Sequence, residues 1–96
     1  MNAARATVPL TAAVGLHARP AMKLARLAKR FPATIRLRSL PDGPWVDAKS
    51  LSRVMALKLR TGAVLEFEAR GEGAREAVDA LCALVAADFR DNGDDG

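Results

Sequence analysis

His17 is the only histidine of this 96-residue chain, and it lies in the run Gly15-Leu16-His17-Ala18-Arg19-Pro20-Ala21. An imidazole is a competent nucleophile near neutral pH, so a histidine can accept a transferable group such as phosphate. Arg19 offers a guanidinium that can hold two phosphate oxygens at once. These residue types allow phosphoryl transfer, but they also allow a histidine that merely caps a helix or has no role.

The residues after His17 are predicted to form a helix from Ala18 to about Phe31, which Pro32 ends. Pro20 is tolerated in the first turn because the N–H that it lacks has no helical partner there. The first-turn amides and the partial positive charge of a helix start favour a phosphate beside His17. At 100° per residue, four cations fall within about 60° of one another, and the apolar residues lie opposite. The cations are Arg19, Lys23, Arg26 and Arg30, and the apolar residues are Ala21, Leu24, Ala25 and Ala28.

Strand and turn signals surround this helix on both sides. The predicted strands are residues 6–12, 34–40, 45–48 and 64–69, and the further helices are a short one capped by Ser50 and one over 74–89. Pro9 places the first strand at a sheet edge. Strict alternation in 64–69 turns Leu65, Phe67 and Ala69 inward. The order β-α-β-β-α-β-α predicts an α+β fold, with two or three helices covering one face of a four-stranded, mostly antiparallel sheet.

The chain carries a formal net charge of +4, from 15 Lys and Arg against 11 Asp and Glu. Such a charge attracts acidic partners but does not choose among nucleic acid, anionic lipid and an acidic protein. Residues 1–90 are expected to form one domain, and residues 91–96 (DNGDDG) are interpreted as an acidic, disordered tail. No apolar run is long enough to span a membrane and the N-terminus lacks a signal-peptide core, so a cytoplasmic location is expected.

Cys82 is the only cysteine, which excludes an internal disulfide. It lies in an apolar helical pattern and is expected to be a small buried hydrophobe. One cysteine and one histidine argue against a structural zinc site, and nothing in the sequence implies a cofactor.

The heptapeptide from Gly15 to Ala21 closely resembles the active-site signature of HPr, the histidine-containing phosphocarrier of the phosphoenolpyruvate-dependent sugar phosphotransferase system. The similarity covers about residues 6–88 and includes Ala48-Lys49-Ser50-Leu51, Val54-Met55-Ala56-Leu57 and Thr61-Gly62. It implies an open-faced β-sandwich with strand order 1-4-2-3. It also implies that His17 accepts phosphate on Nδ1 from Enzyme I and donates it to IIA components, while Arg19 stabilises the phosphoryl group. The chain is then a monomeric carrier rather than a self-contained enzyme.

The resemblance also assigns a docking surface and a regulatory residue. Ser50 matches a serine that a dedicated kinase phosphorylates in many Gram-positive bacteria, although a helix N-cap explains a serine alone. The docking surface comprises Arg26, Lys29, Arg53, Leu51 and Met55. Three positions depart from the family pattern: Val14 stands for a small polar residue, Ser52 for a large apolar one and Lys58 for a glycine.

Two alternatives to a sugar-transport carrier are open. The same phosphohistidine chemistry could serve a regulatory, nitrogen-related branch, which differs only in its partners. More remotely, the Arg-rich surface could bind nucleic acid. Against this, the predicted sheet has few exposed aromatic residues and the sequence shows no RNA-binding motif, so neither nucleic acid nor a membrane is expected as a partner.

Overall fold

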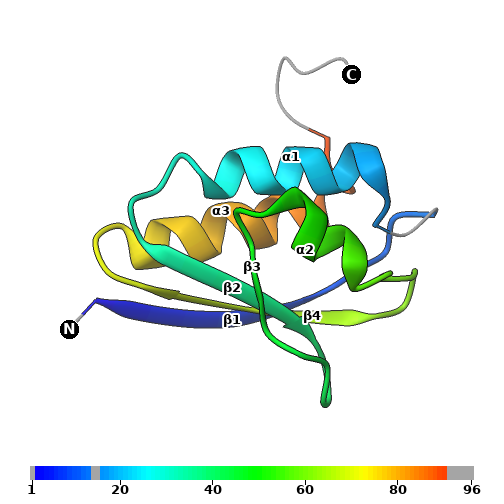
Figure 1. Ribbon diagram of the computed structural model, residues 1–96, viewed down its shortest axis with the longest axis horizontal. Coiled ribbons are helices and arrows are strands. Elements are labelled where there is room, and N and C mark those ends of the chain that lie inside the picture. Colours follow the sequence, from blue (N-terminus) through cyan, green and yellow to red (C-terminus); the bar gives the residue numbers. More distant parts are fainter. Residues whose placement is uncertain (1, 14–15, 91–96) are drawn as a thin grey trace.

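The structure is a computed structural model that describes residues 2–13 and 16–90 (Figure 1). In chain order its elements are β1 (Ala3–Pro9), α1 (Ala18–Ala28), β2 (Thr34–Ser39), β3 (Val46–Asp47), α2 (Leu51–Ala56), β4 (Val64–Arg70) and α3 (Ala74–Ala86). The strands form one antiparallel sheet in the order β1-β4-β2-β3, and all three helices lie on one face of it. The predicted α+β class, element order and strand order are confirmed.

The edge strand β1 is confirmed, but its predicted bounds of 6–12 are wrong at both ends. Ala3 pairs with Arg70 of β4, so the strand begins three residues earlier than its β-branched residues suggested. It ends at Pro9, which pairs with Val64. Pairing with the central strand β4 has therefore overridden the weak strand propensity of the alanines near the N-terminus.

The hydrophobic core lies between the sheet and the helices. Helix α1 buries the four small and apolar residues that its periodicity predicted, namely Ala21, Leu24, Ala25 and Ala28. Strand β4 contributes Leu65, Phe67 and Ala69, which are fully buried as its alternation predicted. Cys82 of α3 is only half-buried and packs at the margin of the core, where burial raises the pKa of its thiol.

Both long helices end three residues before the predicted positions. After Ala28 of α1, the amides of Arg30 and Phe31 bond to carbonyls three residues back, which tightens the chain into turns. After Ala86 of α3, Asp88 and Phe89 adopt positive φ values of 55° and 64°. The amide of Phe89 bonds to the carbonyl of Leu84 at 2.8 Å, and the Phe89 side chain is buried. The apolar periodicity therefore continues beyond the last residue of the helix.

Strand β3 has two residues instead of the predicted four, because only Val46 and Asp47 pair with β2. Strand β2 ends one residue early, at Ser39, and the amide of Leu40 bonds to the carbonyl of Val64 at 2.8 Å. The predicted turn between β2 and β3 depends on Gly43. A Cβ at that position would lie 2.5 Å from the carbonyl oxygen of Ser39, so a side chain would have no room there.

Two carboxylates of β4 alternate with its inward residues, yet they are buried rather than solvated. Glu66 and Glu68 point to the sheet face that carries no helix, yet they are only 7% and 6% exposed. Glu68 accepts hydrogen bonds from Arg5 Nη2 at 2.5 Å and from Arg36 Nε at 2.6 Å. Glu66 accepts one from Arg38 Nε at 2.8 Å. Arginines of β1 and β2 therefore cover the open face where a solvated surface was expected.

Candidate active site

His17 is the N-cap residue of α1, and its side chain is exposed. Its backbone is extended, with φ −119° and ψ −159°, and its carbonyl accepts the first helical hydrogen bond from Ala21 N at 2.9 Å. The imidazole makes no capping hydrogen bond to any residue in the described ranges. The ring is consequently presented to solvent rather than used to close the helix, which contradicts a purely structural capping role for it.

The first turn of α1 is suited to an anion. The amides of Ala18 and Arg19 have no carbonyl of the helix to bond, and Pro20 has no amide at all. No acidic residue lies in this first turn, so no carboxylate of α1 offsets the positive end of the helix there. Arg19 is exposed and lies two residues from His17. An anion beside His17 would therefore meet the positive end of a helix, with Arg19 two residues away.

The chain before His17 is anchored on the backbone of another segment. Leu16 is 4% exposed, and its amide donates to the carbonyl of Leu59 with 3.1 Å between nitrogen and oxygen. The buried Leu16 therefore fixes the backbone, while the side chain of His17 remains in solvent. Val14, named above as a departure from the family pattern, lies outside the described residues.

The other predicted surface residues lie on the two helices that pack together, α1 and α2. Arg26, Lys29 and Arg53 are exposed, and Lys29 follows α1 as its C-cap. Leu51 and Met55 are 37% and 38% exposed, which is unusual for large apolar side chains. Together they form an apolar and basic surface on the helix side of the molecule.

Met22 of α1 was not predicted to belong to this surface. It is 37% exposed, as much as Leu51, although the residue before it, Ala21, is fully buried. It follows Arg19 by three positions and precedes Arg26 by four, so helical periodicity places it on the cationic side of α1. That spacing is the signal by which the sequence could have revealed it.

Lys23 belongs to the predicted cationic stripe but is half-buried and serves the fold as well. Its ammonium donates to the carbonyl oxygen of Phe89 at 2.9 Å and so ties α1 to the end of α3. Arg19 and Arg26 remain exposed along the same helix, and Arg30 is exposed just beyond its end.

Ser50 is the N-cap of α2, as predicted. Its Oγ accepts a hydrogen bond from the amide of Arg53 at 3.3 Å and lies 3.3 Å from Oγ of Ser52. Ser52 is exposed, and its short polar side chain offers little apolar contact. Lys58 adopts φ 52° just after α2, so the chain takes a left-handed conformation there at a residue other than glycine.

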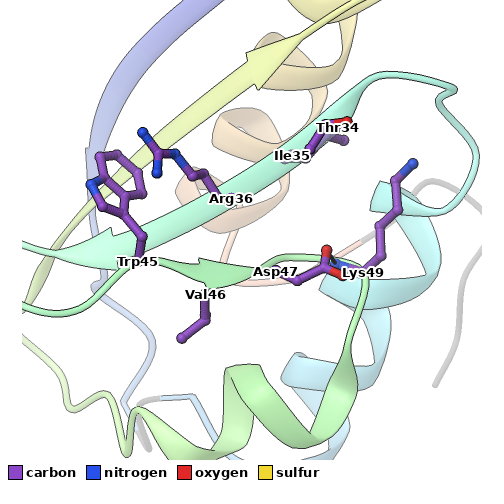
Figure 2. Close-up of a pocket in the computed structure, with 7 residues that line it drawn as sticks. All are labelled: Thr34, Ile35, Arg36, Trp45, Val46, Asp47 and Lys49. Carbon is purple, nitrogen blue, oxygen red and sulfur yellow. Dashed lines mark hydrogen bonds between the residues drawn. The ribbon is translucent and has the colours of Figure 1, made fainter.

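A hollow that does not include His17 lies along β2 and β3 (Figure 2). It has a volume of about 450 Å³ and is lined by Thr34, Ile35, Arg36, Trp45, Val46, Asp47 and Lys49. Figure 2 shows the Trp45 ring beside Arg36, with Val46 pointing to the other side of the strand. The guanidinium carbons of Arg36, Arg38 and Arg5 lie 4.3, 4.6 and 5.9 Å from the centre of that ring.

The polar groups of this hollow are already engaged within the fold. Arg36 bonds to Glu68, the ammonium of Lys49 donates to the carbonyl of Phe31 at 2.8 Å, and Asp47 accepts from the Lys49 amide at 2.9 Å. The charged groups that line the hollow therefore already have hydrogen-bond partners within the fold. Across the part of the chain that the structure describes, no group of His, Cys, Asp and Glu is arranged to hold a metal ion, and no helix is long and apolar enough to cross a bilayer.

Comparison with known proteins connects this geometry to a family. The family described as "PTS HPr component phosphorylation site" matches residues 4–87. The chain is 41% identical over 76 residues to a phosphocarrier protein HPr of Cupriavidus necator, covering 79% of this chain and 83% of that protein. It is 39% identical over 83 residues to a phosphocarrier protein NPr of Escherichia coli, covering 86% and 91%.

A solved structure has the same fold. The crystal structure of an HPr from Thermoanaerobacter tengcongensis superposes with a TM-score of 0.83 and 31% sequence identity, over 97% of this chain and 99% of that one.

Proposed function

Since the chain belongs to the HPr family of phosphotransferase-system phosphocarriers, we propose that His17 accepts a phosphoryl group from phospho-Enzyme I and donates it to IIA components. The observation that carries this proposal is that the imidazole at the start of α1 is exposed and makes no capping hydrogen bond. A residue in that place can meet two different partners in turn, because no part of the described chain covers it.

The transfer needs little covalent help from the chain. The Nδ1 lone pair of His17 forms a bond to phosphorus as the donor's bond to phosphorus breaks, and the electron pair of the broken bond stays on the donor. Positioning and charge stabilisation dominate such reactions. The first-turn amides of α1 and the guanidinium of Arg19 would stabilise the oxygens of the phosphoryl group during transfer. Reversal of the same step on a second partner releases the group.

Partner binding would use the helix side of the molecule. Exposed cations such as Arg26 and Arg53 would attract an acidic partner, and the half-exposed Leu51 and Met55 would supply apolar contact. Met22 extends that apolar contact on α1. Lys29, at the C-terminal end of α1, would add a further cation for docking. The protein would act as a monomeric carrier in the cytoplasm, without a cofactor of its own.

A nitrogen-related branch is the second candidate. It is favoured by the NPr relative, whose identity of 39% is close to the 41% of the HPr relative. In both proposed functions His17 carries the phosphate. The two functions differ in which donor protein binds the helix side of the molecule. Nucleic-acid binding is disfavoured, because three guanidiniums already crowd the ring of Trp45 and so compete with any base that would stack on it.

Ser50 would provide regulation where an HPr serine kinase exists. Its side chain is half-exposed at the start of α2, beside Leu51 of the docking surface. A phosphate there adds about two negative charges where an acidic partner would dock. Its effect would be weaker binding of Enzyme I.

Radiolabelled phosphoenolpyruvate tests the proposal when it is added with Enzyme I of the sugar branch or, in parallel, of the nitrogen branch. Wild-type protein should become labelled, and His17→Ala should not, while its far-UV circular dichroism stays unchanged. The branch that labels faster identifies the donor. Undiminished labelling of His17→Ala would place the acceptor elsewhere. Because a mismatched Enzyme I can fail to dock, the donors should be tested over a range of concentrations.

A further inference from the structure

The backbone that leads to His17 is hydrogen-bonded to the segment that follows α2. The β1–β4 ladder extends beyond the strands, since the amide of Leu10 bonds to the carbonyl of Ala63 at 2.8 Å. The amide of Gly62 bonds back to the carbonyl of Leu10 at 2.9 Å. The chain turns at Thr61 and Gly62, with φ +97° at the glycine.

Thr61 continues this ladder with its side chain. Its Oγ1 donates a hydrogen bond to the carbonyl oxygen of Ala12 across 49 residues of sequence, at 2.5 Å. This bond joins residues 12 and 61 beyond the last pair of the ladder, Pro9 with Val64. Just beyond, the Leu16 amide bonds to Leu59. The segment 59–61 is therefore hydrogen-bonded to the chain at residue 12 and at residue 16, both of which precede His17.

The same segment is the direct continuation of the helix that carries docking residues. Helix α2 ends at Ala56, and Lys58 turns the chain at φ 52° so that Leu59 and Thr61 reach the residues before His17. Any displacement of residues 59–61 would change the placement of the His17 backbone relative to Leu51 and Met55. A partner seated on α2 would then meet the imidazole at a different distance.

From this geometry we propose that Thr61 is a positioning residue for His17, which acts through its hydroxyl on Ala12 and sets the imidazole relative to the docking helix α2. The proposal rests on the phosphocarrier function, because positioning matters only if His17 reacts with a docked partner. Thr61 touches neither the phosphoryl group nor the ring. Its effect should fall on the rate of transfer in the docked complex rather than on docking itself, since small misplacements of a reacting group reduce rates.

The test compares Thr61→Val, which keeps the shape but removes the hydroxyl, with Thr61→Ser, which keeps the hydroxyl. Thr34→Val is the matched control, since Thr34 is an exposed residue of β2 beside the hollow of Figure 2. With phospho-Enzyme I as donor, Thr61→Val should lower kcat about fivefold, the equivalent of one ordinary hydrogen bond, with KM within about twofold of wild type. Thr61→Ser should restore kcat, and Thr34→Val should not change it.

Nuclear magnetic resonance gives a second measurement that needs no donor. As the only histidine, His17 contributes one set of ring resonances, which should shift in Thr61→Val and return in Thr61→Ser. A wild-type kcat in Thr61→Val overturns the positioning role, even if its melting temperature falls. If the wild-type protein takes up no phosphate, the proposed function fails instead, and ring resonances that are identical in all variants would separately overturn the positioning.

Discussion

The Oγ of Ser50 accepts a hydrogen bond from the backbone amide of Arg53 at 3.3 Å, so the candidate regulatory serine is also the cap that begins α2. Capping and the proposed regulation would therefore use the same hydroxyl. They can be separated because aspartate and asparagine both cap helices as well as serine does, and only aspartate adds charge.

Ser50→Asp should bind Enzyme I about tenfold more weakly than wild type, because its carboxylate opposes an acidic partner. Ser50→Asn should bind as wild type does, and Ser50→Ala should lose about 1 kcal/mol of unfolding free energy without losing affinity. Calorimetric titration at two salt concentrations measures the affinities. Equal affinity of the Asp and Asn variants would leave Ser50 with the capping role alone.

Arg19→Ala should slow phosphoryl transfer about tenfold, which corresponds to ~1.4 kcal/mol of transition-state stabilisation. The melting temperature should not change, because Arg19 is exposed at the helix start. Quenched-flow labelling measures the rate, and Arg30→Ala is the matched control, with an exposed arginine removed beyond the other end of α1. An unaltered rate in Arg19→Ala would remove the guanidinium from the mechanism.

Lys58→Gly should stabilise the fold by about 0.5–1 kcal/mol, because glycine adopts a positive φ without the Cβ clash that lysine incurs. The melting temperature should rise by roughly 2–6 °C. Lys58→Ala is the control, since it removes the same charge and keeps the Cβ at φ 52°. Identical melting of the two variants would show that the left-handed turn after α2 carries no strain.

Acid should weaken the open-face cluster through Glu68. Hydrogen bonds from Arg5 and then from Arg36 lower the pKa of this carboxyl to about 2, against an ordinary 4.5. A lowered folded-state pKa stabilises the fold above the unfolded value, and this stability is lost as the pH falls from about 4.5 to about 2.

Glu68→Gln should therefore cost about 2 kcal/mol at pH 7 and show a shallower loss of stability between pH 4.5 and pH 2. Thermal melts followed by circular dichroism give both quantities. The exposed Glu72, changed to Gln, is the control and should keep the wild-type acid profile. A Glu68→Gln variant as stable as wild type at neutral pH would show that the buried carboxylate makes no net contribution to the free energy of unfolding.

The sequence predicted those features that depend on local periodicity. The alternation of Leu65 and Phe67, the apolar side of α1 and the edge position signalled by Pro9 each follow from residue spacing, and the structure confirms them. The exposed position of His17 at a helix start belongs to this group, because a helix N-terminus is recognisable from its own residues.

Features that join distant segments could not be predicted in this way. Glu68 is buried because arginines of two other strands converge on it, and no pattern within β4 indicates their arrival. Phe89 continues the helical spacing of α3, yet it reaches the core through a turn of positive φ. The bond from Thr61 to Ala12 likewise joins two loops whose proximity only the folded sheet establishes.

Trp45 is the only tryptophan of the chain, and its ring packs against Arg36, which bonds to Glu68 on the sheet face opposite the helices. Its fluorescence is thus a built-in optical probe for one side of the molecule. A ligand that quenches this emission has bound behind the sheet, whereas a partner that exchanges phosphate with His17 should leave the signal unaltered.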